Sequence, residues 1–150
     1  MPVDASSLQK VPLFSSLSEK ELKKKLTPLF QERSFGAGHV IAEEGQQGLS
    51  FFIIESGTAR VTAHGEHRAT LGPGSHFGEI GALDPGPRVA TVTAETDLTA
   101  YMLSAWDLRQ VIREDAAVAA GIIEGLVRIV RRLEGSQDAD ATGAEAAEGA

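Results

Sequence analysis

Short apolar or alternating runs, separated by glycines, fill the chain between residues 31 and 103. Runs of this kind are typical of β-strands, and many short strands with turn signals between them favour a sandwich or a barrel. The apolar run from Phe51 to Ile54 contains no polar residue, so we expect that strand to be covered on both faces. The predicted strands are Val40–Ala42, Ser50–Ile54, Ala59–Ala63, Arg68–Leu71, Val89–Thr93 and Thr99–Leu103.

The hydrophobic period changes to that of a helix after Ser104. Ser104 is a suitable N-cap for a helix that runs to about Arg113, and a second helix begins near Asp115 and is ended by Gly135. Apolar residues in the second helix recur at steps of four, four, three and four, which places them on one stripe. That stripe either packs on the β-structure or forms the seam of a homodimer. Its members are Val118, Ile122, Leu126, Ile129 and Leu133.

One helix is also predicted before the strands. Ser18 and Glu21 have the spacing of a capping box, and Pro28 ends the helix at or near Thr27. We expect residues 1–7 to be a flexible leader and residues 8–134 to form one domain. Residues 135–150 are rich in alanine, glycine and acidic side chains, which predicts a disordered acidic tail.

Composition narrows the class of protein. The net charge is −7, and setting aside four tail carboxylates still leaves −3 on the rest, so we expect no DNA binding. The chain has no cysteine, which excludes disulfides and thiolate metal sites and fits a reducing cytoplasm. It begins without the basic and apolar segments of a secretory signal, and its apolar runs are too short to span a membrane. A cytoplasmic location follows as an expectation.

The segment from Gly74 to Val92 carries the strongest chemical signal in the chain. A glycine-rich turn leads into a short helical turn near Glu79, and the backbone amides at such a start suit an anion. Arg88, nine residues later, can fold back over the same place and bind two phosphate oxygens at once. A donor cluster and an acceptor therefore stand together, as a phosphate next to a sugar hydroxyl requires.

Two blocks of residues are similar to a known family. The first runs from Gly38-His39-Val40-Ile41 through Glu44-Gly45 to Phe52-Ile53-Ile54, Gly57 and Val61. The second joins Phe77-Gly78-Glu79-Ile80-Gly81-Ala82-Leu83 to Pro87-Arg88-Val89-Ala90-Thr91-Val92. From Leu8 to Leu133 the chain resembles the cyclic nucleotide-binding domain of catabolite activator proteins and kinase regulatory subunits. The resemblance implies a mainly β fold, a jelly-roll barrel with an N-terminal helix and two C-terminal helices.

The resemblance also implies a role for each residue of the second block. Glu79 would accept a hydrogen bond from the ribose 2′-hydroxyl, and Arg88 would pair with the cyclic phosphate. The backbone amides of Gly81 and Ala82 would donate to the phosphate. The remaining positions implied to line the site are Phe77, Gly78, Ile80, Val89, Ala90 and, from the first block, Val61.

Two positions depart from the family pattern. Many members carry Ser or Thr where this chain has Val89, and valine cannot make the hydrogen bond that favours guanine. By resemblance the ligand is therefore cyclic AMP, with cyclic GMP as the alternative, and no cofactor is expected. Ser75 stands where Gly-Asp often precedes the Phe-Gly-Glu sequence, and serine also serves local turns.

Other side chains suggest competing interpretations. His64, His67 and His76 could indicate a cupin-like metal site, but the first two lie in a predicted hairpin turn and the usual His-x-His pair is absent. No nucleophile motif or carboxylate pair indicates an enzyme. Trp106 is expected to pack on the roll. Arg132 and Ser136 lie where family members place contacts to the base.

The leading hypothesis is a cyclic nucleotide receptor that signals by moving its C-terminal helices to an effector protein not yet known. Family transcription factors continue into a helix-turn-helix domain, whereas here only the acidic tail follows. The second hypothesis is an interaction module that keeps the fold but does not use the ligand. A homodimer through the last helix is compatible with both hypotheses.

Overall fold

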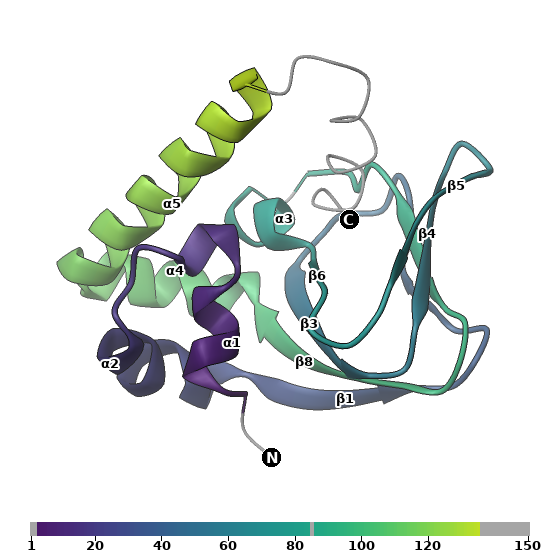
Figure 1. The fold of residues 1–150 in the computed structure, drawn as a ribbon, viewed down its shortest axis with the longest axis horizontal. Coiled ribbons are helices and arrows are strands. Elements are labelled where there is room, and N and C mark those ends of the chain that lie inside the picture. The colour runs from purple at the N-terminus through teal and green to yellow at the C-terminus, as the bar shows by residue number, and fades with distance from the viewer. Residues whose placement is uncertain (1–2, 85, 136–150) are drawn as a thin grey trace.

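The computed structural model describes residues 3–84 and 86–135, with only the backbone of residue 80 inside its helix. Within these residues the strands form two four-stranded antiparallel sheets, ordered β1-β8-β3-β6 and β2-β7-β4-β5. The strands form a roll on one side of the molecule, and the helices gather on the other side (Figure 1). The strands are β1 Gln31–Phe35, β2 Val40–Ala42, β3 Ser50–Ser56, β4 Ala59–Ala63, β5 Glu66–Leu71, β6 His76–Phe77, β7 Thr91–Ala94 and β8 Leu98–Ser104.

The central strand β3 is covered on both faces, as its apolar run predicts. Side chains alternate across a strand, so Phe51 and Ile53 join a core shared with the helices, whereas Phe52 and Ile54 join a core inside the roll. The ring of Phe52 stacks on that of Phe77 with centroids 4.9 Å apart. β3 therefore contributes side chains to both hydrophobic cores, the one under the helices and the one inside the roll.

Two helices follow the roll as expected. Ser104 caps α4 (Ala105–Glu114) by accepting a hydrogen bond of 3.1 Å from the Asp107 N–H. Asp115 separates α4 from α5 (Ala116–Gly135) and accepts from the Val118 N–H at 3.1 Å. The predicted mainly β fold with flanking helices is confirmed. No helix in the described ranges is long and apolar enough to cross a bilayer.

The apolar stripe of α5 packs against the beginning of the chain. Gly121 and Gly125 lie on the same inner side, where an added Cβ would meet backbone or side chain. At Gly125 that Cβ would lie 2.8 Å from the Leu13 carbonyl carbon and 2.9 Å from the Pro12 oxygen. Val118, Ile122 and Ile129 are buried, and Leu126 and Leu133 pack against the same core. The predicted stripe is thus used inside the chain and not free to form a dimer seam.

The first residues differ from the expected flexible leader. Asp4 caps helix α1 (Ala5–Gln9) by accepting from the Ser6 N–H, and Val3, Ala5 and Leu8 are buried in the helical core. The expectation was wrong for residues 3–7, because burial of the three apolar side chains in the helical core stabilises an ordered segment. Residues 1–2 and 136–150, including the predicted tail beyond Gly135, lie outside the described residues.

The capping box before the second helical segment is confirmed. The Ser18 N–H donates to Glu21 Oε1 and the Glu21 N–H donates to Ser18 Oγ, both at 3.1 Å. The helix then widens into a π-turn before it ends near Pro28, as expected. The short helices before the roll are η1 Pro12–Phe14, α2 Glu19–Glu21, η2 Leu22–Leu26 and η3 Thr27–Leu29, and α3 Glu79–Leu83 follows β6 and packs against β3 and α4.

Candidate functional site

Glu79 begins α3 directly after strand β6 and is fully buried. Gly78 makes the turn with φ +83°, a backbone conformation that side chains with a Cβ rarely adopt. The carboxylate lies beside the His76 ring, with Nδ1 3.9 Å from Glu79 Oε2. A carboxylate at the start of a helix is favoured by the helix dipole, so the local structure keeps an acceptor in the interior.

Arg88 is the second buried charged side chain of this region, with 8% of its surface exposed. Its Nη2 donates to the Ser50 carbonyl at 3.4 Å, and its backbone forms a pair of 2.8 Å hydrogen bonds with Gly45 and Gln46. Burial lowers the pKa of the guanidinium, but arginine remains protonated at neutral pH. Nη1 is buried and makes no hydrogen bond to any of the described residues. The site therefore holds a buried positive side chain whose Nη1 can still donate hydrogen bonds.

Gly48 brings the helix of Glu79 and the side chain of Arg88 to one place. A Cβ on Gly48 would lie 3.2 Å from Arg88 Cγ and Cζ, and a Cβ on Gly81 in α3 would lie 3.6 Å from the Gly48 carbonyl oxygen. The Gly48 N–H also donates to Gly86 at 3.1 Å, which ties the two loops together. Sequence reasoning treated Gly48 only as punctuation, because a close approach between distant segments leaves no local signal.

The apolar residues predicted to line the site lie in the interior of the roll. Phe77, Ala90 and Val61 are fully buried members of the roll core. Val89 differs from them, since 53% of its surface is exposed and β7 begins only at Thr91. The predicted wall formed by the Ile80 side chain falls outside the described residues.

Of the two amides expected to donate to phosphate, one is already used. The Ala82 N–H donates to the Gly78 carbonyl at 3.1 Å, as the regular bond of the single turn of α3. Donation from the Ala82 amide to a phosphate therefore stays a prediction. Gly81 stays next to Gly48, on the side of α3 that approaches Arg88.

His76 is a member of the site that sequence reasoning considered only as a metal ligand. Burial, together with the nearby positive charge of Arg132, lowers the pKa of its ring to about 4. The ring also lies 5.9 Å from that of Phe51. His76 is therefore neutral at pH 7, with Glu79 of α3 at 3.9 Å and Arg132 of α5 close enough to affect its pKa. The other base-contact candidate, Ser136, lies outside the described residues.

Two other histidines, His64 and His67, lie in the hairpin of β4 and β5. The predicted hairpin turn is confirmed at His64 and Gly65, where both φ angles are positive as in a type I′ turn. The His64 side chain is 80% exposed, with Nδ1 3.3 Å from Glu44 Oε2. Among the residues with a described placement, no group of three or more His, Cys, Asp or Glu side chains could hold a metal ion.

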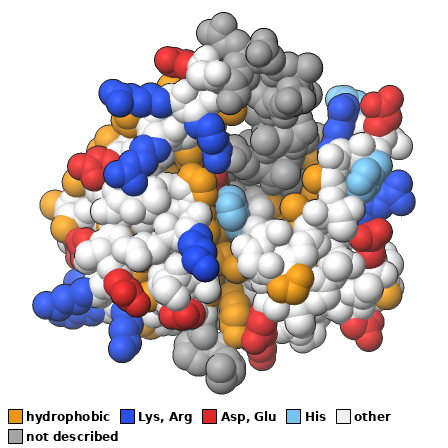
Figure 2. All heavy atoms as spheres, viewed as in Figure 1, with side chains coloured by type: hydrophobic (Ala, Val, Ile, Leu, Met, Phe, Trp, Pro, Cys, Tyr) orange, Lys and Arg blue, Asp and Glu red, His pale blue; other side chains and the backbone are white. Residues whose placement is uncertain are grey.

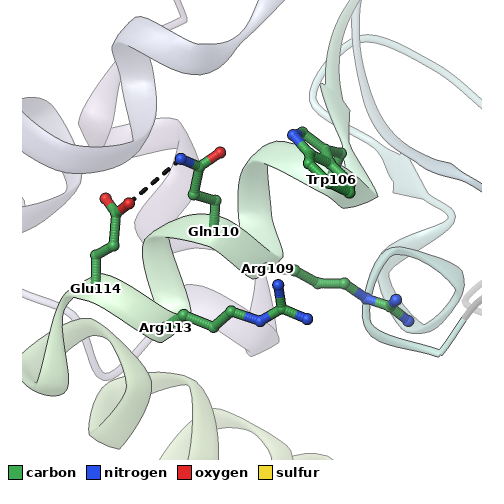
Figure 3. A pocket seen from close by; sticks show the side chains of 5 residues that line it. All are labelled: Trp106, Arg109, Gln110, Arg113 and Glu114. Carbon is green, nitrogen blue, oxygen red and sulfur yellow. Dashed lines mark hydrogen bonds between the residues drawn. The ribbon is translucent and has the colours of Figure 1, made fainter.

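Trp106 does not pack on the roll as expected, because 74% of its surface is exposed. It stands on the first turn of α4 in a cleft lined also by Arg109, Gln110, Arg113 and Glu114 (Figure 3). Arg109 reaches from α4 to α3, where its Nη2 donates to the Leu83 carbonyl at 2.9 Å. In the view of Figure 2, apolar atoms are exposed along the boundary between the helices and the roll, and basic side chains gather mainly over the helices.

A family described as the cyclic nucleotide-binding domain matches residues 32–115 of the chain. The cAMP-dependent protein kinase regulatory subunit of Hypocrea atroviridis is 32% identical over 126 residues, covering 84% of this chain and 25% of that protein. The type II regulatory subunit of Drosophila melanogaster is 31% identical over 132 residues, 88% of this chain and 35% of that protein. The chain thus spans about a quarter to a third of the length of these relatives.

Two solved structures resemble the whole arrangement. The N-terminal domain of a transcriptional regulator from Streptomyces coelicolor A3(2) superposes with a TM-score of 0.78 at 25% identity, covering 87% of this chain and 96% of that one. The Thermus thermophilus catabolite activator protein superposes with a TM-score of 0.67 at 32% identity, covering 85% and 62%. These relatives and structural neighbours are regulatory subunits, a transcriptional regulator and an activator protein.

Proposed function

Because the chain belongs to the cyclic nucleotide-binding domain family, we propose that it is a cyclic nucleotide receptor that binds cyclic AMP between α3 and Arg88. The relatives named above are cAMP-dependent regulatory subunits, which favours this ligand over cyclic GMP. The absence of a hydroxyl at Val89 points the same way, since valine cannot hydrogen-bond a guanine amino group.

The observation that carries this proposal is the state of Arg88. A buried charge is costly unless it is paired and hydrogen-bonded. Nη1 has no hydrogen-bond partner among the described residues, and Nη2 has only a long bond to the Ser50 carbonyl. A cyclic phosphate would supply two acceptor oxygens and one negative charge, which the planar guanidinium can bind side by side.

The other residues of the site have complementary tasks. Glu79 would accept a hydrogen bond from the ribose 2′-hydroxyl, and the Gly81 amide would donate to the phosphate. Val61 and Ala90, buried in the roll core, would form an apolar floor for the ligand. Gly48 has no side chain to obstruct the approach of phosphate to Arg88.

Ligand binding would reach the C-terminal helices through α3. Arg109 of α4 already bonds to the last residue of α3, and Arg132 of α5 lies near His76 beside Glu79. A ligand that draws α3 toward Arg88 would therefore change the position of α4 and α5, if it binds one arrangement more tightly than the other.

A homodimer through α5 would use its outer side. Ile123, Val127 and Val130 recur at steps of four and three and are between 46% and 61% exposed. They form a row next to the buried stripe, so a second copy could cover them without displacing the N-terminal segment.

Titration calorimetry of the chain with cyclic AMP and with cyclic GMP tests the proposal. We expect saturable heat with both and tighter binding of cyclic AMP. Val89→Ser should narrow the difference between the two affinities by restoring the missing hydroxyl, whereas Val40→Ser, at an exposed valine on β2, should not. No heat and no thermal stabilisation by either nucleotide would leave the alternative function, a ligand-independent interaction module.

A further inference from the structure

An exposed apolar pair lies beside the ligand site without belonging to it. Leu49 is 53% exposed and Trp106, the only tryptophan of the chain, is 74% exposed. Both line one cleft with Arg109, and its other lining residues are Ser50, Ser104 and Ala105. A tryptophan side chain can bury 150–250 Å² of surface, roughly, so leaving it in water forgoes a large favourable contribution. We call Leu49, Trp106, Arg109 and Arg113 the α4 surface.

The charge of the α4 surface is opposite to that of the whole chain. Arg109 and Arg113 follow Trp106 along α4, and both side chains extend to the same side of the helix (Figure 3). Glu114 is the carboxylate among the residues lining this cleft, and it accepts a hydrogen bond of 3.3 Å from Gln110 Nε2. On a chain of net charge −7, two arginines beside an indole form a local basic and apolar site.

Short connections join the α4 surface to both sides of the ligand site. The Ala105 N–H donates to the Leu49 carbonyl at 2.7 Å. Leu49 lies between two residues that meet the Arg88 side chain. A Cβ on Gly48 would lie 3.2 Å from Arg88 Cγ, and the Ser50 carbonyl accepts a hydrogen bond of 3.4 Å from Arg88 Nη2. Arg109 binds the carbonyl of Leu83 at the end of α3. The positions of Leu49 and Arg109 therefore depend on where Arg88 and α3 lie.

We propose that the α4 surface binds an acidic segment of an effector protein, one that carries at least one large apolar side chain. Tryptophan and arginine are the residue types that most often dominate protein–protein binding energy, and the two arginines complement a carboxylate-rich partner. A second copy of this chain or a nucleic acid would bring negative charge far beyond the two arginines, where it would meet the chain's own net charge of −7, whereas a short acidic segment need contact only the α4 surface. That cyclic nucleotide changes the affinity for this partner rests on the function proposed above. By linkage, the partner then changes the affinity for the nucleotide by the same factor.

Selection from a random peptide library displayed on phage tests the surface directly. We expect enriched peptides to combine acidic residues with a large apolar one, and their affinity to fall roughly tenfold or more with Trp106→Ala or Arg113→Glu. Val40→Ala, an exposed apolar substitution on β2, is the matched control and should bind them like wild type. Enriched peptides that are basic, or that bind Trp106→Ala equally well, would overturn the proposal. The proposal would also be overturned if a single-stranded oligonucleotide bound more tightly than the selected peptides. A homodimer in sedimentation that Trp106→Ala dissociates would overturn it as well.

Fluorescence of Trp106 then tests the coupling, since it reports from the surface itself. The affinity of a selected peptide should change when cyclic AMP is present, and binding of the nucleotide alone is measured by calorimetry. Nucleotide binding without any effect on peptide affinity would refute the coupling. If the nucleotide does not bind, the proposed function fails, while the peptide selection still decides whether the α4 surface is a docking site.

Discussion

Acidification should destabilise the protein through one side chain, His76. The pKa of its ring is lowered from 6.5 to about 4, first by burial and second by Arg132. Between these two pH values the unfolded chain takes up a proton at His76 that the folded chain does not. The free energy of unfolding therefore falls as the pH falls from about 6.5 and levels off below about 4.

The size of this effect follows from the difference between the two pKa values. One pKa unit corresponds to about 1.4 kcal/mol, so the complete loss is about 3 kcal/mol. That is a large part of the stability of a domain of this size, which is typically about 5–15 kcal/mol. The pKa values of Asp4 and Asp115 are lowered from 3.8 by hydrogen bonds, so their contributions are lost only at more acidic pH.

Urea denaturation measured at a series of pH values tests this reasoning. We expect stability to rise with pH between about 4 and 6.5, and His76→Gln to remove most of that rise because glutamine does not titrate. His64→Gln is the matched control at an exposed position and should keep the wild-type slope. A flat profile in the wild-type protein, or an unchanged slope in His76→Gln, would show that the ring is not held neutral by its surroundings.

Three substitutions test the framework around the site by chemical denaturation, each with its own measure of failure. Gly125→Leu should destabilise the fold by about 1–3 kcal/mol or more through overpacking against the N-terminal segment, whereas Glu124→Leu on the exposed side should not; equal effects would refute the close packing of α5. Ser18→Ala should cost about 1 kcal/mol as a lost cap, and an unchanged denaturation midpoint would contradict the capping box. Gly78→Ala should cost about 1–2 kcal/mol because φ is +83° there and should weaken nucleotide binding in calorimetry. Gly36→Ala, in open space without a positive φ, serves as its control, and a similar loss in both would be evidence against strain at Gly78.

The strands that could be predicted from the sequence are those with a strong apolar signal. Val40–Ala42 and Ala59–Ala63 have the predicted bounds, and β3 extends only two residues beyond its apolar run. β1 was missed because its sequence is polar, with four of its five residues exposed, and it pairs only with β8 at the edge of its sheet. β6 has two residues, too few to show a period.

The site was predictable where its chemistry is local and not where it depends on tertiary contacts. Glu79 and Arg88 stand out in one sequence segment, and the structure buries both. The roles of Gly48 and His76 depend on segments that approach from elsewhere in the chain, so no spacing could reveal them. Trp106 shows the opposite limit, since a large apolar residue predicts burial and here remains exposed. Its exposure is what points to a partner.

Binding of cyclic AMP to Arg88→Ala, measured by calorimetry beside wild type, tests the central claim most directly. Removing one partner of a buried charge pair should cost about 2–5 kcal/mol, a loss of roughly 30- to 4,000-fold in affinity. Arg60→Ala, at an exposed arginine on β4, is the control and should bind like wild type. Equal affinity of Arg88→Ala and wild type would contradict the assignment of Arg88 as the phosphate ligand.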